Sequence, residues 1–395
     1  MDNDFEWINK KYSEIRADLD ELAAQWHARP KLLNAKSAKP YYSIGQAARL
    51  VGRTPESIRD AENKNLVKPP ALDQKTGRRI GYTLEQINHL RAHFKTFPHR
   101  DPADPPAVIN LHNLSSGIGK SCICTHLAHG LAIQGYRVLV IDANPEATTT
   151  AVFGFVPVLE VGYMDTIAPA LAGECDSLVP LARRTVIDQV DLIPSSYSPH
   201  AATSIFSAHL PERVAIQRMS DQVGELAANY DVVLIDSAPT QDASFVPLLF
   251  SSNALLVPHP PSGPRVLPTL RSLMMLGDRV AARHSSDVRL HFNWILGLVN
   301  ESSAKDAGMQ ASCPDHCNVP LQTMRTQIRY NRKIGEAFDN FSTVFSNANP
   351  SRSDKTLCSA ISNLWAMTRD IERQVHHTWP TRLAVLRESG HIQHY

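Results

Sequence analysis

Residues 107–148, AVINLHNLSSGIGKSCICTHLAHGLAIQGYRVLVIDANPEAT, combine two short apolar runs with a glycine-containing loop and a longer helical pattern. The runs at 107–111 and 137–142 are rich in Val, Ile and Leu, which is typical of strands buried on both faces of a parallel sheet. The residues between them predict a helix over 120–135. DVVLID, NALLVP and NWILGLV repeat the strand pattern later in the chain. We therefore expect an α/β fold, a parallel sheet with helices on both faces.

The loop 115–121, SSGIGKS, follows the first strand and opens the helix, where backbone N–H groups and a helix N-terminus can bind phosphate oxygens. Gly117 and Gly119 permit a tight turn, and Lys120 would reach the β- and γ-phosphates of a nucleotide. Leu114 stands where the ordinary phosphate loop has a further glycine, so the match to that template is partial. The expected nucleotide contacts are Gly117, Ile118, Gly119, Lys120, Ser121 and Cys122.

An earlier part of the chain has the pattern of short, capped helices separated by a turn and a hairpin. Ser43 and Thr54 are expected to cap two helices on either side of a turn at Gly52. Residues 73–82, DQKTGRRIGY, predict a hairpin, and Thr83 begins a capping box for a third helix. The arrangement resembles a winged helix-turn-helix of the MerR-like type.

The charge of this part favours a nucleic-acid partner. Residues 41–100 have a net charge of +6 and the rest of the chain −5, although the whole chain has only +1. A winged helix would bind DNA with its second helix and its hairpin. A small basic helical domain that binds protein is the alternative. The expected DNA contacts are Arg53, Ser57, Arg59, Lys64, Arg78 and Arg79.

These patterns divide the chain into four parts. Residues 1–38 predict a dimerisation helix, with an amphipathic helix packed on its own domain as the alternative. Residues 39–97 form the expected winged helix, 98–106 a proline-rich stiff linker, and 107–395 the nucleotide-binding domain. The coiled-coil seam consists of Phe5, Ile8, Tyr12, Ile15, Leu19, Leu22 and Trp26, at alternating spacings of three and four.

Composition excludes several classes of protein. No apolar segment approaches the roughly 20 residues of a membrane span, and the acidic N-terminus lacks the apolar core of a signal peptide, so we expect a cytoplasmic protein with no membrane partner. Six cysteines in a chain of 395 residues form no disulfide framework, and Cys122 and Cys124 are expected to be reduced thiols. Whether Cys313, His316 and Cys317 bind metal or form a polar loop stays open.

Three segments in order carry a resemblance to a known family. SSGIGKS, IDANPEAT at 141–148 and VVLIDSAPT at 232–240 occupy the places of a deviant phosphate loop KGGxGK[ST], a DxDPQ segment and a strand ending in Asp. The chain resembles the ParA family of plasmid and chromosome partition ATPases, in particular its longer members with an N-terminal helix-turn-helix, such as the RepA proteins of repABC plasmids. The resemblance implies ATP and Mg²⁺ as cofactors, a homodimer that binds DNA nonspecifically, a ParB-like centromere-binding partner, and repression of its own operon.

Ser116 replaces a glycine of the family loop, and two further departures bear on hydrolysis. The family's signature lysine, which reaches the partner's nucleotide in the dimer, is here Ser115, and its water-activating carboxylate is Asn144. Asn cannot accept a proton near neutral pH, and losing a positioned base typically costs about 10²- to 10⁴-fold in rate. We therefore expect nucleotide binding with weak or absent hydrolysis; an intact enzyme using other residues is one alternative, and a non-hydrolysing DNA-binding transcriptional regulator that keeps the fold as a dimer scaffold is another. The expected magnesium ligands are Ser121, Asp142 and Asp236.

The last third of the chain carries one further pattern. MRTQIRYNRKIGEAF, residues 324–338, predicts a helix with Arg325, Arg329, Arg332 and Lys333 along it. In the resembled family, nonspecific DNA contacts come from C-terminal basic patches. A solvated basic helix face is the alternative.

Overall fold

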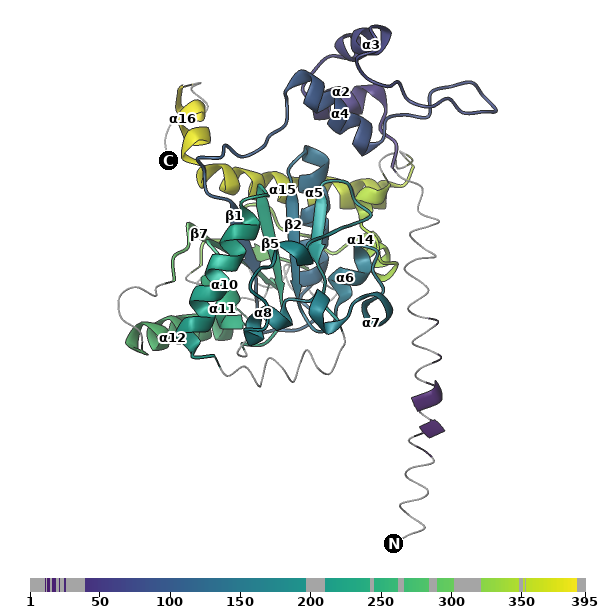
Figure 1. Ribbon diagram of the computed structural model, residues 1–395. Coiled ribbons are helices and arrows are strands. Elements are labelled where there is room, and N and C mark those ends of the chain that lie inside the picture. Colours follow the sequence, from purple (N-terminus) through teal and green to yellow (C-terminus); the bar gives the residue numbers. More distant parts are fainter. Residues whose placement is uncertain are drawn as a thin grey trace.

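A computed structural model describes the chain over most of its length (Figure 1). The described residues are scattered positions between 11 and 25, and 40–388 except 197–209, 242–244, 262–265, 284–289, 302–320, 348–350 and 352. All the seam positions predicted for the N-terminal helix, and the candidate metal ligands Cys313, His316 and Cys317, lie outside these residues. Across the described helices, none combines the length and the apolar character needed to cross a membrane.

The core of the fold is a seven-stranded sheet in the order β3-β4-β2-β5-β1-β6-β7. Its central strands pair in parallel, which confirms the predicted parallel sheet, and only the short edge strand β3 runs antiparallel, to β4. The strands are β1 (Ala107–Leu111), β2 (Val138–Ala143), β3 (Arg183–Arg184), β4 (Val190–Ile193), β5 (Val232–Ser237), β6 (Ala254–His259) and β7 (Trp294–Val299).

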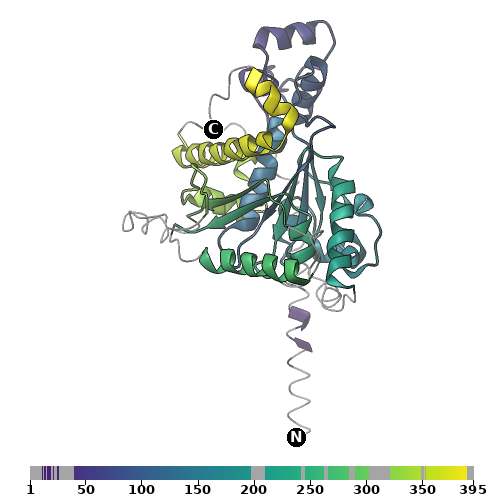
Figure 2. The same ribbon diagram turned by 90° about the vertical axis from the view of Figure 1, so that its left-hand side faces the viewer.

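Helices cover both faces of the sheet, as the apolar runs predict (Figure 2). Alternate residues of each strand face opposite layers: Leu234 packs in the cluster that contains α5 and α15, whereas Val233 packs with α10. The described helices that follow β1 are α5 (Lys120–Gln134), α6 (Thr148–Val152), α7 (Pro157–Glu160), α8 (Ala168–Ala172), α10 (Glu212–Ala227), α11 (Phe245–Phe250), α12 (Leu267–Arg283), α14 (Arg332–Asp339), α15 (Lys355–His377) and α16 (Pro380–Glu388). Among the described residues, short 3₁₀ helices lie at Tyr163–Asp165, Val179–Leu181 and Val344–Ser346.

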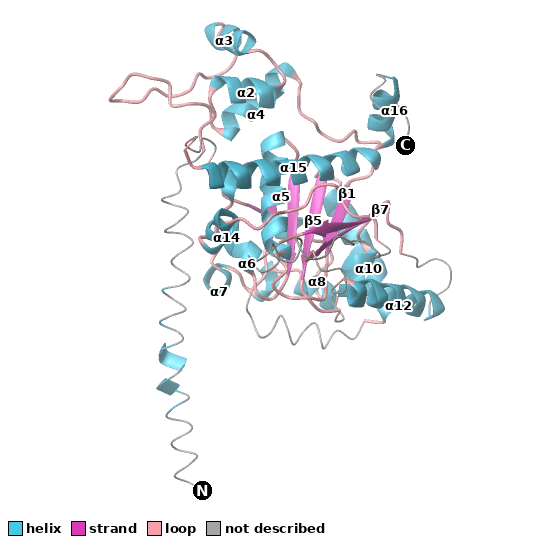
Figure 3. Ribbon diagram, turned by 180° about the vertical axis from the view of Figure 1, so that it is seen from behind, coloured by secondary structure: helices cyan, strands magenta, loops and turns pink. Residues whose placement is uncertain are grey.

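Between residue 40 and the sheet the chain forms the short helices α2 (Ile44–Val51), α3 (Pro55–Asn63) and α4 (Leu84–Phe94). The predicted caps are confirmed: Ser43 and Thr83 each form a capping box, and the Thr54 side chain accepts from the backbone of the first turn of α3. Gly52 ends α2 with φ 69°, a left-handed conformation that favours glycine. Figure 3 places these helices beyond α15, at the end of the sheet opposite α8.

The segment between α3 and α4 forms the predicted hairpin. Leu72 and Arg79 form an antiparallel bridge, and the N–H of Asp73 donates to the carbonyl of Arg78 at 2.8 Å. The Asp73 carboxylate accepts from the backbone N–H and the hydroxyl of Thr76, which closes the turn. Gly77, with φ 64°, completes it.

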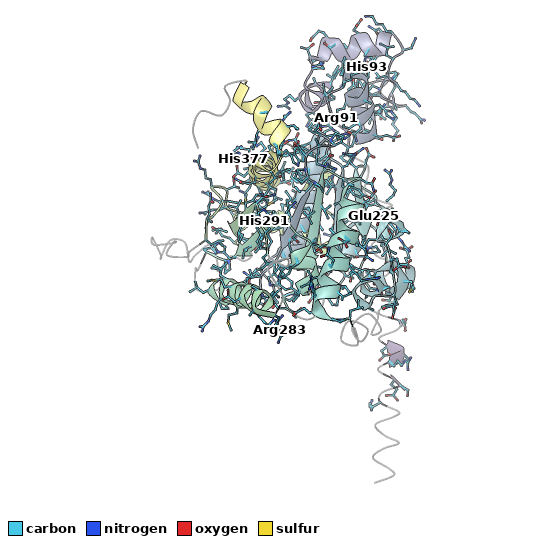
Figure 4. All side chains as sticks on the ribbon, turned by 60° about the vertical axis from the view of Figure 1, so that its left-hand side comes forward. Arg91, His93, Glu225, Arg283, His291 and His377 are labelled. Carbon is cyan, nitrogen blue, oxygen red and sulfur yellow. The ribbon has the colours of Figure 1, made fainter. Side chains whose placement is uncertain are left out.

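A buried arginine joins helices α2 and α4 to the sheet domain (Figure 4). Arg91 of α4 is fully buried, and its guanidinium donates to the carbonyls of Leu50, at the end of α2, and Ile133, at the end of α5, at 3.1 and 2.6 Å. It also donates to the Asn88 side chain, which in turn donates to Asp188 in the turn before β4. Helix α5 therefore begins at the glycine-containing loop and ends at this joint.

The proline-rich segment 98–106 is fastened to the sheet domain. The backbone N–H of Arg100 donates to the Asp231 carboxylate at 2.9 Å, and its buried guanidinium donates to the carbonyls of Ala228 and Asp104. The Asp104 carboxylate accepts in turn from the backbone of Thr381, the residue after the start of α16. The segment is stiff because of these contacts as well as its prolines.

The predicted helix over residues 324–338 is wrong in its first half. The N–H groups of Met324 and Ile328 donate to the carbonyls of Gly297 and Val299, both at 2.8 Å, so this segment is drawn alongside β7. Helix α14 begins only at Arg332, capped by the preceding asparagine. Pairing with a strand outweighed the helical spacing, and Arg325 and Arg329 therefore do not share a helix with Arg332 and Lys333.

We predict that Arg91→Ala destabilises the protein by about 3–5 kcal/mol, because it leaves buried carbonyls without a donor and creates a cavity. Urea denaturation measures the loss. Arg49→Ala, at an exposed position of α2, is the matched control and should change stability by less than about 0.5 kcal/mol. Equal, small effects of the two substitutions would show that the joint contributes nothing.

Candidate functional site

The loop between β1 and α5 has the backbone geometry of a phosphate cradle. Gly117 and Gly119 have φ values of 69° and 81°, which favour glycine. At Gly119 there is also no room for a side chain, because a Cβ atom would lie 2.6 Å from the Nδ2 atom of Asn300. That same amide donates to the carbonyl of Ile118 at 2.7 Å, which holds the loop against the end of β7.

Lys120 is the first residue of α5 and points back into its own loop. Its ammonium donates to the carbonyls of Asn113 and Ser115 at 3.0 and 2.9 Å, and the residue is only 6% exposed. Burial lowers the pKa of Lys120, and the nearby carboxylates of Asp236 and Glu146 partly oppose this effect. Because its partners are neutral carbonyls, phosphate oxygens could replace them with a stronger, charge-assisted interaction.

Two buried aspartates lie side by side at the carboxyl ends of β2 and β5. Asp142 and Asp236 are register partners in these strands. Burial and then the charge of Asp236 raise the pKa of Asp142 to about 7, and burial also raises the pKa of Asp236. Hydrogen bonds to Asp236 from the hydroxyls of Thr149 and Ser121 oppose that shift.

The two carboxylates fit a divalent cation. Both oxygens of Asp142 accept hydrogen bonds, from the N–H of Asn144 and from the N–H and hydroxyl of Thr150, whereas Oδ1 of Asp236 is buried with no partner in the described part of the chain. A buried carboxylate oxygen without a partner is costly, and a hard cation would satisfy it. The structure therefore brings together the expected magnesium ligands Ser121 and Asp236, with Asp142 beside them.

Ser115 and Asn144 occupy positions that carry charge in the resembled family. Here each forms a hydrogen bond within its own loop. The N–H of Ser115 donates to the Asn113 side chain at 2.8 Å. Asn144 is only 5% exposed, and its Oδ1 accepts from the N–H of Glu146 at 3.1 Å, as in an Asx turn. Neither side chain supplies a base or a cation at these positions.

Ile118 and Cys122 are the remaining expected nucleotide contacts. Ile118 is buried, and the Cys122 sulfur lies 3.6 Å from Nδ1 of His126. Burial raises the pKa of Cys122 to about 12 and that of Cys124 well above its usual value, so both are protonated thiols. Neither forms a disulfide, as expected.

Sequence reasoning missed several polar residues that build this site. Asn113 accepts from the backbone of Ser115 and from the hydroxyl of Thr269 on α12. Thr149 and Thr150 bond the two aspartates. Position is a signal for Asn113 and Asn300, which lie within two residues of the ends of β1 and β7, because ligand sites of parallel sheets lie at the strands' carboxyl ends. Thr149 and Thr150 lie farther on, in helix α6. Thr269, on a helix distant in sequence, gave no such signal.

The residues expected to contact DNA on α3 and its preceding turn differ in their exposure and in their contacts with other side chains. Arg59 is exposed. Lys64 is also exposed but forms an ion pair with Asp60 at 2.7 Å, and the Ser57 hydroxyl lies 3.2 Å from that of Thr54. The guanidinium of Arg53 turns back over the last ring of α4, 5.5 Å from its centroid.

The two expected contacts on the hairpin also differ. Arg78 is exposed, and its side chain has no hydrogen-bond or ion-pair partner among the described residues. Arg79 forms an ion pair with the buried carboxylate of Glu62 on α3, with Nη1 2.7 Å from Oε2. Among the six expected DNA contacts, Arg59 and Arg78 are therefore the basic residues most available to an external partner.

Comparisons with known proteins agree with this geometry. A family described as an AAA domain matches residues 106–283. Protein SopA of Escherichia coli K12 is 27% identical over 86% of this chain and 90% of its own, and a putative replication protein A of Rhizobium rhizogenes is 26% identical over 73% and 75%. Among solved structures, one titled a partition protein covers 92% of this chain and 98% of its own, with a TM-score of 0.58 at 20% identity. An ATP complex of the Cyanothece protein McdA covers 68% and 98%, with a TM-score of 0.51 at 15% identity.

We predict that Asp236→Asn stabilises the metal-free protein by about 1–3 kcal/mol, because it removes one of two buried, mutually repelling carboxylates. Thermal unfolding in EDTA should then show a raised midpoint. Asp142→Asn is the matched control and should lower the midpoint, because an amide NH₂ would face donors that now bond both oxygens. A lowered midpoint for both variants would contradict the assigned repulsion.

Proposed function

We propose that this chain, which is similar to SopA and to other plasmid partition proteins, is a ParA-type, DNA-binding partition protein that binds ATP with Mg²⁺ and hydrolyses it slowly or not at all. The observation that carries the proposal is the loop at 115–121, with Lys120 held inside it beside the buried pair Asp142 and Asp236. The solved structure of McdA with ATP is a relative of the same fold.

Binding would use groups that this chain retains. Backbone N–H groups of the loop and the first turn of α5 would hold phosphate oxygens, and Lys120 would exchange two carbonyls for the phosphates. Ser121, Asp142 and Asp236 would hold Mg²⁺, which supplies positive charge to the phosphates when it is bound. The unpartnered oxygen of Asp236 supports this assignment.

Hydrolysis would lack two catalytic groups of the family, the water-activating carboxylate and the signature lysine. Asn144 cannot take a proton from the attacking water, and Ser115 brings no charge to a partner's nucleotide. These losses act on the transition state, whereas the binding groups act on the ground state as well. Nucleotide capture with slow turnover is therefore the expected behaviour.

We propose that residues 39–97 are a winged helix-turn-helix that binds DNA and that residues 107–395 form the nucleotide domain. The net charge of +6 over residues 41–100 and the exposed Arg59 and Arg78 support the DNA contact. By analogy with the family, the chain would act in the cytoplasm as a homodimer, bind a ParB-like centromere-binding protein, and repress its own operon. The relatives SopA and plasmid partition protein A support a role in partition.

A second candidate is a non-hydrolysing, DNA-binding transcriptional regulator that uses the nucleotide fold as a dimer scaffold. The neutral residues Ser115 and Asn144 favour it. The two candidates differ in turnover: ATP hydrolysis that disappears in Lys120→Ala would exclude the regulator, and tight binding without any turnover would exclude a partition motor.

We predict that Lys120→Ala weakens binding of MgATP by at least about 100-fold, because it removes a side-chain cation that would contact the phosphates. Isothermal calorimetry measures the affinity. Lys355→Ala, which replaces the exposed first residue of another helix, α15, is the matched control and should leave the affinity unchanged. Wild-type protein that gives no heat with MgATP would contradict the proposed ligand.

We also predict that Arg59→Ala and Arg78→Ala each weaken DNA binding. Loss of a phosphate contact at Arg78 should lower affinity similarly for all sequences and reduce the salt slope by about one. Fluorescence anisotropy at several salt concentrations measures both quantities. Arg184→Ala, on the edge strand β3 and 85% exposed, is the control. Wild-type binding in both test variants would remove the proposed helix-turn-helix function.

A further inference from the structure

A buried carboxylate on α3 connects that helix to the hairpin. Glu62 lies on the inner face of α3 beside Ile58 and Ala61, and its side chain is only 2% exposed. Its Oε1 accepts from the hydroxyl of Tyr82 at 2.7 Å, and its Oε2 accepts from Nη1 of Arg79 at 2.7 Å. A carboxylate this deeply buried is costly unless it is paired and hydrogen-bonded, so these two partners allow Glu62 to remain charged there.

The cluster of Glu62, Arg79 and Tyr82 joins separate elements. Glu62 belongs to α3, Arg79 to the second arm of the hairpin, and Tyr82 to the residues just before α4. Tyr82 is itself fixed by a backbone bridge to Tyr42, with both N–H···O distances at 2.8 Å. The cluster therefore sets the angle of the hairpin relative to α3.

Arg78 and Arg79 are neighbours in sequence with opposite surroundings. Adjacent residues of an extended arm point to opposite sides, which places Arg79 toward Glu62 and Arg78 away from it. The Arg79 side chain is 46% exposed, but its charge is already compensated by a carboxylate. A phosphate would have to compete with Glu62 for Arg79, whereas Arg78 has no competing partner among the described residues.

We propose that Arg79 is a positioning residue, which braces the hairpin against α3 through Glu62 and Tyr82, and that Arg78 is the residue of this pair that binds a DNA phosphate. The proposal rests on the proposed DNA-binding function of residues 39–97. It changes the expectation that both arginines contact DNA, and it adds Glu62 as a determinant of how α3 and the hairpin fit a duplex together.

Salt dependence of DNA binding separates the two roles, because each neutralised phosphate contributes about 0.9 to the slope of log K against log salt. The full chain is titrated with a fixed 30-base-pair duplex of arbitrary sequence and with a duplex selected from a random library by the wild-type protein. Arg78→Ala should reduce the slope by about one on both duplexes. Arg79→Ala should leave the slope nearly unchanged, lower the thermal midpoint, and reduce the preference for the selected duplex.

Glu62→Gln should change the salt slope in the direction opposite to Arg78→Ala. It keeps the size and a hydrogen-bonding side chain but releases the Arg79 charge, so the slope should increase by up to about one, while the preference for the selected duplex falls. The double variant Glu62→Gln/Arg79→Met should recover much of the thermal midpoint that Arg79→Ala loses, because no buried charge is then left without a partner.

Two results would overturn the brace while leaving the DNA-binding function intact. One is an Arg79→Ala slope reduced as much as that of Arg78→Ala. The other is a Glu62→Gln slope equal to that of the wild type, with the preference for the selected duplex retained. Wild-type protein that binds neither duplex would instead overturn the DNA-binding function itself, and the brace with it.

Discussion

Helix α5 is the constraint on which the rest of the structure depends. It is buried on nearly all sides, between the sheet and α15, and Gly130 allows α15 to approach so closely that a Cβ atom there would lie 2.5 Å from the Thr368 hydroxyl. Its 15 residues span about 22 Å, from Lys120 in the candidate phosphate loop to the carbonyl of Ile133 that Arg91 holds. The loop and the contact with the N-terminal helices therefore lie at opposite ends of α5, and Figure 1 shows α5 beside α15, below α2 and α4.

In the candidate site, the residues that would bind nucleotide differ from the positions that would act in its hydrolysis. Lys120 and the neighbouring aspartates are held by buried hydrogen bonds. Burial is the main cause of the raised pKa of both carboxylates, the charge of Asp236 raises the pKa of Asp142 further, and a bound cation would oppose these shifts. Ser115 and Asn144 instead bond their own loops. The loop with the geometry of a phosphate cradle is thus present, while Ser115 and Asn144 are neutral at the two positions where the resembled family has charged side chains.

Much of this architecture could be predicted from the sequence. The strand β1, the caps at Ser43 and Thr83, and the start of α5 at Lys120 follow from local rules of apolar patterning, capping and glycine conformation. Long-range partners could not be predicted in the same way. The ion pair of Arg79 with Glu62, the burial of Arg91 and the contact of Thr269 with Asn113 depend on which segments the fold brings together. The helix predicted to begin at residue 324 was wrong for the same reason, because the first half of that segment forms backbone hydrogen bonds with β7 instead.

The most direct test of the central claim is the fate of a single bound nucleotide. Protein is loaded with radiolabelled MgATP, free nucleotide is removed, and the ratio of bound ATP to ADP is followed over several hours. The account predicts that the wild type keeps its nucleotide as ATP, whereas Asn144→Asp cleaves it faster by about 10²-fold or more. Rapid cleavage by the wild type, unchanged by Asn144→Asp, would contradict the account.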